Sequence, residues 1–307
     1  MDEHSRYAVV TGANKGVGFE ICRLLYMKGV TVILTSRDEK KGVEAVCRLK
    51  EELSQQGSAS LVGVGEVLFH QLEVTDSASI GSLVEFIESQ YGKLDILVNN
   101  AGISGIVMDG NAFRRAVERA GGWPIDEQEW KEIATQDHKM AEECLATNYL
   151  GAKRVTEALI PLLQQSDSPR IVNISSLLGL LKNIPRKSAT DALSDMESLT
   201  RDGIEKILME FVDDFRQGRL EANGWPVICS AYILSKAALN AYTRLLAKEL
   251  PSFLVNSICP GFIKTDMTFN TGFMSPLEGA ESPVFLALLP KTGPSGLFFS
   301  RKEVFPF

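Results

Sequence analysis

A glycine-rich turn near the N-terminus constrains the fold of this chain more than any other feature. The turn reads Thr-Gly-Ala-Asn-Lys-Gly-Val-Gly at 11–18, between an apolar run at 7–11 and an amphipathic stretch from about 17 to 28. Glycines let the chain turn tightly and let its backbone approach a pyrophosphate, which the partly positive N-terminus of a helix attracts. Because a strand precedes the turn and a helix follows it, the pattern predicts a dinucleotide site rather than an ordinary turn. The expected contacts are Gly12, Asn14, Lys15, Gly16, Val17 and Gly18.

Short apolar runs alternate with longer amphipathic stretches over the rest of the chain. Further strands are expected at 31–36, 67–72, 96–99, 170–175 and 253–259, and helices at 40–55, 77–91, 230–250 and in a long segment ending near 163. This alternation predicts an α/β fold with a doubly wound parallel sheet covered by helices on both faces. A length of 307 residues suits one large domain with insertions better than two full domains. We therefore expect a single dinucleotide-binding domain over 1–307.

Two segments are longer than the usual connection between a strand and a helix. They span about 103–135 and 177–226, after the fourth and the fifth predicted strands. Long insertions at this edge of a sheet often build the substrate site, so we expect these segments to cover it. Within the second, apolar residues recur at helical spacing from Ile204 to Phe215. The apolar face of that helix packs either on its own domain or on a partner, and the spacing alone does not decide which.

The composition argues against several classes of partner. A net charge of −7 disfavours binding to a nucleic-acid backbone, which requires clustered cations. The five scattered cysteines indicate reduced thiols rather than a disulfide framework or a zinc site, and the three histidines are far apart. The first residues are polar, and no apolar run reaches the length of a membrane span. We expect no metal, no nucleic acid and no membrane contact, and a cytoplasmic location.

Tyr232 and Lys236 are four residues apart and therefore share one face of the helix expected at 230–250. A phenol with a pKa of about 10 is a poor acid at neutral pH, and a nearby ammonium lowers that pKa toward the useful range. The strand at 170–175 ends in Ser175 and Ser176, at the carboxyl edge where doubly wound sheets bind ligands. A serine hydroxyl there can hydrogen-bond a substrate carbonyl. Either feature alone is common, but together, after a glycine-rich first half, they predict a proton-transfer site.

The glycine turn, the segment Asn99-Asn100-Ala101-Gly102 and the Tyr232/Lys236 pair resemble the short-chain dehydrogenase/reductase family over nearly the whole chain. The resemblance implies that Ser176, Tyr232, Lys236 and Asn148 are catalytic, with Asn148 holding a water that relays a proton from the lysine. It also implies that Tyr232 and Lys236 contact the cofactor, as do residues at the strand ends. Those residues are Leu72, Glu73, Asn99, Ala101, Gly102, Pro260, Gly261, Ile263 and Thr265. Glu73 departs from the aspartate that is usual in the family.

The end of the second strand predicts which nicotinamide cofactor is bound. Enzymes selective for NAD place an acidic residue there for the ribose 2'-hydroxyl, whereas a cation suits the 2'-phosphate of NADP. This sequence has Ser36 and Arg37, with Lys15 in the glycine turn as a second cation. We therefore expect NADPH. Asp38 would weaken this preference if it turned inward, and the alternative is that these cations form a solvated basic surface.

The 56 positions from Ser176 to Tyr232 are far more than in multimeric members of the family. Together with Gly224-Trp225-Pro226 and Pro294-Ser295-Gly296, the insertion resembles monomeric carbonyl reductases, in particular the branch of plant salutaridine and menthone reductases. The resemblance implies a monomer that reduces a ketone or aldehyde on an apolar, cyclic terpenoid or alkaloid. Apolar residues flank the inferred site, but they can equally belong to the core. One alternative is reduction of an enone double bond; a relative in that branch catalyses this reaction and lacks the tyrosine, which is present here as Tyr232. The other alternative is a sensor or scaffold that binds NADPH without turnover.

Overall fold

One sheet runs through the centre of the molecule. In the computed structural model, which describes residues 5–55, 65–123 and 127–307, the described strands form an eight-stranded sheet in the order β3-β2-β1-β4-β7-β8-β9-β10. Neighbouring strands are parallel except β9 and β10, which are antiparallel. The bounds are β1 (Arg6–Val10), β2 (Val30–Ser36), β3 (Val67–Gln71), β4 (Ile96–Asn99), β7 (Arg170–Ile174), β8 (Leu254–Cys259), β9 (Phe298–Ser300) and β10 (Glu303–Phe305). The predicted doubly wound sheet is confirmed.

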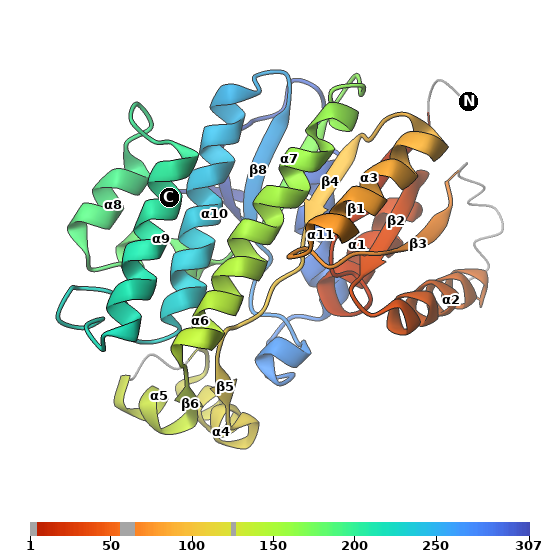
Figure 1. The fold of residues 1–307 in the computed structure, drawn as a ribbon. Coiled ribbons are helices and arrows are strands. Elements are labelled where there is room, and N and C mark those ends of the chain that lie inside the picture. The colour runs from red at the N-terminus through yellow and green to blue at the C-terminus, as the bar shows by residue number, and fades with distance from the viewer. Residues whose placement is uncertain (1–4, 56–64, 124–126) are drawn as a thin grey trace.

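Helices cover both faces of this sheet, so the molecule has three layers (Figure 1). The bounds are α1 (Gly16–Tyr26), α2 (Glu39–Gln55), α3 (Ser77–Tyr91), α6 (His138–Leu145), α7 (Ala152–Leu163), α8 (Lys187–Ser194), α9 (Arg201–Arg216), α10 (Ser230–Glu249) and α11 (Pro276–Ala287). One buried cluster joins the sheet to α3, α6, α7, α8, α9 and α10, and a second joins it to α1, α2 and α11. Successive strand residues point to opposite faces, so Val9 belongs to the first cluster and Val10 to the second.

The long helix predicted to end near residue 163 is interrupted. A π-helical turn, η2 (Ala146–Gly151), joins α6 to α7. Asn148 lies within this turn and is buried. Such turns insert one residue into a helix and are frequent at functional sites. The apolar periodicity does not reveal the turn, because the buried positions of α6, η2 and α7 follow one another at ordinary helical spacing.

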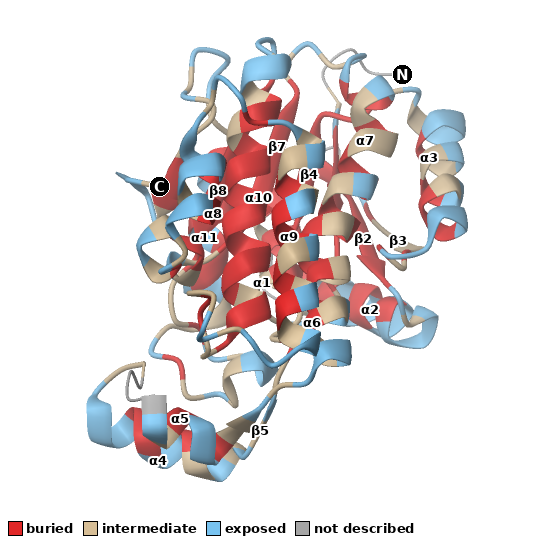
Figure 2. Ribbon diagram, turned by 60° about the vertical axis from the view of Figure 1, so that its left-hand side comes forward, coloured by how far each residue is buried: buried red, intermediate tan, exposed pale blue. Residues whose placement is uncertain are grey.

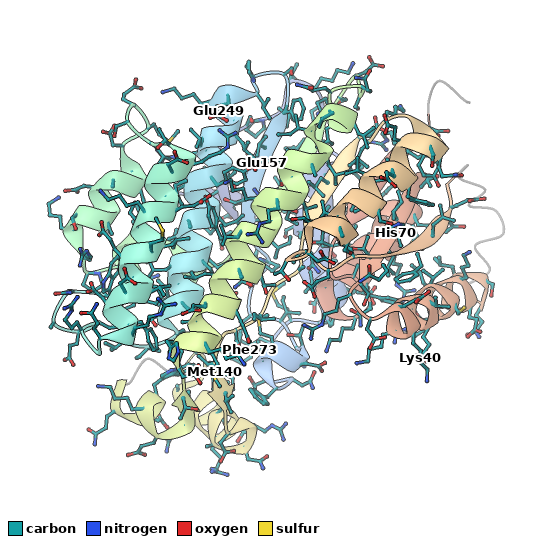
Figure 3. All side chains as sticks on the ribbon, viewed as in Figure 1. Lys40, His70, Met140, Glu157, Glu249 and Phe273 are labelled. Atoms are coloured by element: carbon teal, nitrogen blue, oxygen red, sulfur yellow. The ribbon has the colours of Figure 1, made fainter. Side chains whose placement is uncertain are left out.

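The amphipathic helix of the second insertion packs on its own domain. α9 buries Ile204 and Phe211 in the same cluster as α6 and α10. At its first residue, Arg201 donates to Glu157 of α7 and to both carboxylate oxygens of Glu249 at the end of α10 (Figure 3). The apolar face of α9, whose packing partner the sequence did not predict, is therefore covered by α6 and α10 of the same chain.

The first insertion forms a small lobe that projects from one end of the sheet (Figure 2). The described part contains β5 (Val107–Met108), α4 (Gly110–Ala120), α5 (Glu127–Ile133) and β6 (Ala134–Thr135), and residues 124–126 lie outside the described residues. The rings of Phe113, Trp123 and Trp130 pack together. Trp123 also meets Phe262, from the loop after β8, at 5.7 Å between ring centroids. We call residues 103–135 the lobe; its aromatic core links it to that loop.

The C-terminal part holds elements that apolar periodicity did not predict. α11 begins with a capping box in which Ser275 and Glu278 each bond the other's backbone, and Pro276 occupies the first turn. β9 and β10 have three residues each. In strands this short, the alternation of apolar and polar residues is too brief to distinguish a strand from a loop. The sequence signal for α11 was its cap rather than its periodicity.

Candidate active site

The glycine turn and the Asn-Asn-Ala-Gly segment lock together at the carboxyl edge of the sheet. Gly12 and Gly16 have φ angles of 61° and 62°, a left-handed conformation that glycine adopts without steric cost. A Cβ on Gly12 would lie 2.9 Å from the Cα of Ala101. The Thr11 hydroxyl accepts hydrogen bonds from the backbone N–H groups of Asn100 and Ala101, both at 2.9 Å. The turn that would receive a pyrophosphate is therefore held by the neighbouring strand end.

Asn99 belongs to a buried ladder of side chains beside this turn. Its Nδ2 donates to Thr156 Oγ1 at 2.9 Å and to Asn173 Oδ1 at 2.8 Å. Asn173 Nδ2 in turn donates to Thr243 Oγ1 at 2.8 Å. The ladder joins β4 and β7 to α7 and α10, so the Asn99 side chain stabilises the sheet at the point where the Asn-Asn-Ala-Gly segment begins.

Among the charged residues that follow β2, Arg37 has no ion-pair partner within the described part of the chain. Arg37 is also exposed. Asp38 accepts the backbone N–H of Lys41 at 3.0 Å, and its other oxygen is 3.4 Å from the Lys41 ammonium. The bond from the Lys41 backbone is the main cause that holds the pKa of Asp38 below its ordinary value. The Asp38 carboxylate therefore interacts with the first turn of α2. Lys41 adds a second cation to this edge of the sheet.

Lys15 has an ion-pair partner on the loop after β8. The Lys15 ammonium pairs with Asp266, after β8, at 2.5 Å, and both side chains are exposed. Arg48 of α2 reaches the glycine turn instead: it donates to the Asn14 carbonyl at 3.4 Å and lies 4.2 Å over the Phe19 ring. Exposed ion pairs contribute little to stability. A phosphate can therefore replace Asp266 as the partner of Lys15 at small cost.

The end of β3 presents Leu72 rather than an acidic side chain. The buried Leu72 donates its N–H to the Ser36 carbonyl at 3.0 Å, which joins the ends of β2 and β3. The Glu73 carboxylate accepts from the Thr75 N–H and hydroxyl at 3.1 and 2.9 Å. The Glu73 backbone N–H is held by Ser79 at 2.9 Å. The Glu73 side chain is therefore occupied within its own turn.

The loop after β8 lies against the glycine turn. Gly261, next to Pro260, has a φ of 110°, which favours glycine. Ile263 is buried against Gly279 of α11, where a Cβ would lie 2.7 Å from the isoleucine Cδ1. Thr265 caps a short 3-10 turn, η5 (Asp266–Thr268), and its Cγ2 lies 3.5 Å from where a Cβ on Gly16 would be. The predicted residues of this loop and of the glycine turn are thus brought together.

Ser176, Tyr232 and Lys236 converge where β7 ends against α10. The Ser176 side chain lies close enough to the Tyr232 phenol to lower its pKa, and the Ser176 hydroxyl accepts the Leu178 N–H at 3.1 Å. The Lys236 ammonium donates to the Ile174 carbonyl at 2.8 Å and lies 5.6 Å from the centre of the Tyr232 ring. The Ser175 hydroxyl donates to the Lys236 carbonyl at 3.4 Å and is buried. Ser176 is therefore the serine that faces the phenol.

Burial moves both titratable groups toward their neutral forms. Desolvation is the largest effect on Tyr232 and raises its pKa, while the hydrogen bond with Ser176 acts in the opposite direction. Desolvation also lowers the pKa of Lys236 to about 8. Burial is the largest influence on the Tyr232 pKa, and the lowering of that pKa by Lys236 stays a prediction. Tyr232 holds its proton firmly, and Lys236 is the group that titrates closer to neutral pH.

Asn148 is fixed in place by hydrogen bonds to its carboxamide. Its Oδ1 accepts the Ile103 N–H at 2.8 Å, and its Nδ2 donates to the Ile103 carbonyl at 2.9 Å. Nδ2 also donates to Ser235 Oγ at 3.0 Å and to Cys144 Sγ at 3.3 Å. These bonds tie η2 both to the strand end at Ile103 and to α10.

The site has the shape that a nicotinamide dinucleotide requires. Gly102 lies close to two functional groups: a Cβ there would lie 3.2 Å from Asn148 Oδ1 and 3.6 Å from Lys236 Nζ. Around Gly16, the Thr265 methyl is the one heavy atom within 4 Å of an added Cβ. Space without side chains above a glycine turn at a helix N-terminus is what a pyrophosphate needs. The residues present therefore fit a nicotinamide dinucleotide.

Several contacts of the site were not predicted, and for most of them the sequence held no signal. Ser235 and Cys144 touch Asn148, but Ser235 is 87 positions away along the chain. Arg48 and Lys41 lie on the exposed side of α2, where charged residues are ordinary.

The described residues lack other kinds of site. They contain no group of three or more His, Cys, Asp or Glu side chains placed to hold a metal, and no helix long and apolar enough to cross a bilayer. All five cysteines are free thiols.

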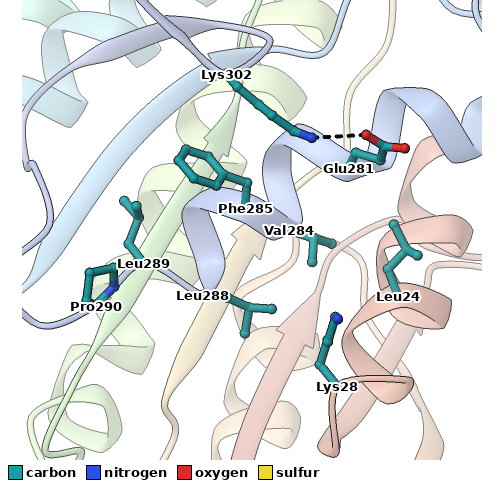
Figure 4. Close-up of a pocket in the computed structure, with 9 residues that line it drawn as sticks. All are labelled: Leu24, Lys28, Glu281, Val284, Phe285, Leu288, Leu289, Pro290 and Lys302. Carbon is teal, nitrogen blue, oxygen red and sulfur yellow. Dashed lines mark hydrogen bonds and ion pairs between the residues drawn. The ribbon is translucent and has the colours of Figure 1, made fainter.

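A separate apolar groove lies between α1 and α11 (Figure 4). Its volume is about 380 Å³, and Leu24, Phe285 and Leu288 contribute to its walls. Lys302 at its rim is paired with Glu281 at 3.1 Å. None of the predicted catalytic or cofactor residues lines this groove, so it is not part of the candidate active site.

A glycine turn at the first strand, with a serine, tyrosine and lysine at the same sheet edge, defines a dinucleotide-dependent oxidoreductase. The chain belongs to the short-chain dehydrogenase family, whose model matches residues 6–189 and 222–273. The unmatched residues 190–221 contain all of α9, so this helix is an addition to the common fold.

Individual relatives cover the full length of the chain. The chain is 53% identical over 307 residues to the (+)-neomenthol dehydrogenase of Arabidopsis thaliana, covering 100% of this chain and 99% of that one. It is 36% identical over 319 residues to the carbonyl reductase (NADPH) 1 of Mus musculus, with both chains fully covered. It also matches the solved structure of salutaridine reductase from Papaver somniferum with a TM-score of 0.85 and 46% identity, covering 96% of this chain and 99% of that one.

Proposed function

We propose that this protein uses NADPH to reduce a ketone or aldehyde on an apolar, cyclic substrate of the terpenoid or alkaloid class to an alcohol. The single observation that carries the proposal is the convergence of two groups on the Tyr232 phenol: Ser176, which lowers its pKa, and the Lys236 ammonium, which lies 5.6 Å from the centre of its ring. A protonated phenol beside a serine hydroxyl is equipped to bind and protonate a carbonyl oxygen.

The residues have distinct tasks in this reaction. Bound NADPH supplies the hydride, and the protein supplies positioning and electrostatics. Ser176 donates a hydrogen bond to the carbonyl oxygen and Tyr232 transfers its proton to that oxygen. Lys236, whose pKa is lowered to about 8 by burial, returns a proton to Tyr232 and holds the ribose of the cofactor. Asn148 holds the water that resupplies Lys236.

The preference for NADPH rests on the charges after β2. Arg37 is exposed and without an ion-pair partner among the described residues, and Asp38 is occupied by Lys41. A free guanidinium binds a phosphate in a bidentate manner, whereas a carboxylate is needed for the hydroxyl of NAD. The mouse relative, which carries NADPH in its name, supports the same choice.

The class of substrate follows from apolar surface around the site and from the relatives. Leu177, Met267 and Phe273 have relative exposures of 38%, 41% and 61%. Leu177 follows Ser176 directly, and the other two lie on the loop after β8. Large apolar side chains exposed beside polar catalytic groups are typical of ligand sites. The named substrates of the neomenthol and salutaridine relatives are of the same character, and we propose that the lobe and the segment at 177–226 form the cover of the site.

The monomeric state and the cytoplasmic location are part of the proposal. α9 covers α6 and α10 within the chain, which leaves less apolar surface for a partner. Five free thiols suit a reducing compartment. Sedimentation and fractionation of the native protein test these two statements directly.

The activity is tested with purified protein, NADPH and a panel of cyclic terpenoid and alkaloid ketones, alongside enones. We expect oxidation of NADPH with an alcohol as product. A saturated ketone from an enone would favour double-bond reduction instead, and cofactor binding without turnover on any substrate would favour a sensor or scaffold.

The cofactor preference is tested with Arg37→Ser. Loss of the charge-assisted bonds of Arg37 should raise the KM for NADPH by about tenfold to a hundredfold and leave the KM for NADH nearly unchanged. Lys291→Ser, which removes an exposed charge outside the site, is the matched control. An equal effect on both cofactors would remove Arg37 from the site.

A further inference from the structure

Two consecutive residues after η5, Phe269 and Asn270, have left-handed backbone conformations. Their φ angles are 50° and 58°. Asparagine is enriched in this conformation, whereas a bulky residue such as phenylalanine is an outlier there. Such a conformation persists only where the surrounding structure offsets its cost, and residues of this kind cluster at functional sites. The left-handed Phe269 therefore points to a compensating contact of its side chain.

Hydrogen bonds within the turn fix the backbone that carries Phe269. The Asn270 N–H donates to the Thr265 carbonyl at 2.9 Å, and the Thr268 hydroxyl donates to the Ile263 carbonyl at 2.6 Å. Ile263 and Thr265 are among the predicted cofactor contacts. Phe269 is therefore held by the part of the loop after β8 that we expect to contact the cofactor.

The Phe269 ring fills the space beside Gly110, the first residue of α4. A Cβ on Gly110 would lie 2.8 Å from Cε1 of this ring and still closer to its Cδ1, so a side chain at position 110 would overlap the ring. The centroids of the Phe269 and Phe113 rings are 6.2 Å apart. The Arg114 guanidinium donates to the Phe269 carbonyl at 3.4 Å. The ring therefore packs against the first turn of α4, where the absence of a side chain on Gly110 lets it approach.

The core of the lobe borders the candidate active site. Its buried residues, together with one that directly precedes α10, are Phe113, Ala116, Val117, Trp130, Ile133 and Cys229. Tyr232 and Phe262 both pack against this cluster while remaining partly exposed. The position of the lobe relative to Tyr232 therefore depends on the contacts that hold α4, and Phe269 supplies one of them from the loop after β8.

We propose that Phe269 is a positioning residue that holds the lobe over the substrate site. The inference rests on the proposed function, in which the lobe covers the bound ketone. The ring keeps α4 against the loop after β8, so the lobe is in place before the substrate binds. Without the ring, the fraction of molecules with the lobe in place falls, and the apparent affinity for the ketone falls in proportion. Phe269 has no part in hydride or proton transfer, so the chemical step itself stays unchanged.

Gly110 and Phe269 form a pair that can be tested from both sides. Phe269→Gly removes the ring and leaves a left-handed backbone that glycine adopts without strain. Gly110→Ala keeps the ring but places a methyl group where the ring lies, so the ring and α4 must move apart. Because alanine is a better helix former than glycine, a loss of helix propensity in α4 cannot explain an effect of Gly110→Ala.

Asn270 offers a matched control in the same turn. Its φ angle is close to that of Phe269, but it is exposed, and its side chain forms no hydrogen bond with the described residues. Asn270→Gly thus introduces the same residue in the same backbone conformation without removing the ring that packs on α4.

The kinetic experiment uses the full chain with NADPH and a ketone that the wild type reduces. We expect Phe269→Gly and Gly110→Ala each to raise the KM for the ketone about tenfold, with kcat and the KM for NADPH within about twofold of wild type. The variant that combines both substitutions should be no worse than either alone, because the added methyl group then occupies space that the ring has left. Asn270→Gly should stay within about twofold of wild type in all three constants.

Hydrogen exchange of the free protein follows the lobe without turnover. In Phe269→Gly and in Gly110→Ala the amides of α4 should exchange about tenfold faster than in wild type, because the helix has lost a packing contact. The amides of α9, which packs on α6 and α10, should exchange at the wild-type rate in both variants.

Three kinetic results overturn the inference. A wild-type KM for the ketone in both single variants shows that the ring does not hold the lobe. A rise in the KM for NADPH as large as the rise for the ketone assigns Phe269 to the cofactor loop instead. An equal rise in Asn270→Gly assigns the effect to the turn rather than to the ring.

Two further cases keep the test decisive. If Phe269→Gly does not fold, Gly110→Ala answers the question by itself. A wild-type protein without carbonyl reduction contradicts the proposed function, and the exchange rates of α4 then still test the contact. Unchanged exchange of α4 in the variants would contradict the positioning role of Phe269, whatever the reaction.

Discussion

Two buried polar clusters of this protein handle charge in opposite ways. The first surrounds Asp214 at the end of α9. Its carboxylate accepts from Trp225 Nε1 at 2.8 Å, from Arg219 at 3.0 Å and from Arg186 at 3.3 Å. Desolvation alone would raise the pKa of Asp214, but the bonds from Trp225, Asn223 and Arg219 outweigh it and hold the pKa below the ordinary value. This charge is buried because it is fully paired.

The second cluster surrounds Tyr232 and Lys236. Lys236 is only 4% exposed, donates to the neutral Ile174 carbonyl and has no carboxylate partner among the described residues. Desolvation therefore prevails, and it lowers the pKa of Lys236 to about 8 and raises that of Tyr232. A buried charge that is paired stabilises one structure, whereas a buried charge left without a counterion is costly and easily gives up its proton. The difference separates the cluster that holds the insertion in place from the cluster for which we propose proton transfer.

Tyr232→Phe gives the largest expected effect and tests the second cluster. Ketone turnover should fall by about 10²- to 10⁴-fold, because the variant lacks the acidic proton. The fold and the affinity for NADPH should be retained, since the ring still packs in the same place. Turnover is measured by NADPH oxidation and binding by fluorescence titration. Near-normal turnover would show that another group is the acid.

Asp214→Ala tests the first cluster and should have the reverse profile. Removing this buried carboxylate takes the acceptor from Trp225 and Arg219 and one of two carboxylate partners from Arg186, and it should lower the free energy of unfolding by about 3–5 kcal/mol. Turnover per folded molecule should be unchanged. Asp213→Ala is the control, because Asp213 is 65% exposed and 3.7 Å from Arg216 and should have little effect. Equal effects of the two variants in urea denaturation would remove Asp214 from its structural role.

The same contrast predicts how Asp214 responds to acid in the wild type. The folded pKa of Asp214 lies below its ordinary value of 3.8. The stabilisation by Asp214 is therefore fully present above that ordinary value and is lost as the pH falls through the lower folded value. In Asp214→Ala this acid-dependent part of the unfolding curve should be absent.

Lys236→Met should stabilise the protein while it abolishes efficient turnover. The folded pKa of about 8 lies below the ordinary 10.5, so the unfolded chain binds the proton more tightly and the charge destabilises the fold. This penalty is complete below pH 8 and disappears as the pH rises from 8 to 10.5. We expect Lys236→Met to gain roughly 1–3 kcal/mol at neutral pH. The gain should vanish in alkaline unfolding experiments, and a gain independent of pH would contradict the contrast.

The two clusters also differ in how far the sequence predicted them. Tyr232 and Lys236 were predicted from their spacing, because two residues one helical turn apart share a face whatever the rest of the fold. Asp214 was not predicted, since its partners come from three other segments and its sequence context is an ordinary amphipathic helix. The strands and most helices followed from apolar periodicity, which reflects the two faces of the sheet.

What the sequence did not predict depends on three-dimensional environment. The burial of Tyr232, which is the largest influence on its pKa, could not be predicted from the spacing of Lys236. The ion pair of Lys15 with Asp266 spans 251 positions of the chain and was not predicted either. The π turn at Asn148 left no mark on the apolar pattern. These features depend on contacts between segments that are distant in sequence, and a local sequence pattern does not report such contacts.

Asp38 extends the comparison of the two clusters to a charge that lies outside both of them, and the smallest effects are expected here. Its carboxylate accepts the Lys41 N–H, so Asp38→Ala should lose a helix cap and melt at a slightly lower temperature, whereas Asp38→Asn, which can still accept that bond, should not. Neither variant should change the ratio of the KM values for NADPH and NADH by more than about twofold, because the side chain is directed to α2 and screened by water. If both variants strengthened NADPH binding equally, the Asp38 charge would act on the cofactor from outside any buried cluster. Solvent would then screen the interaction between the Asp38 charge and the cofactor less than the exposure of Asp38 implies.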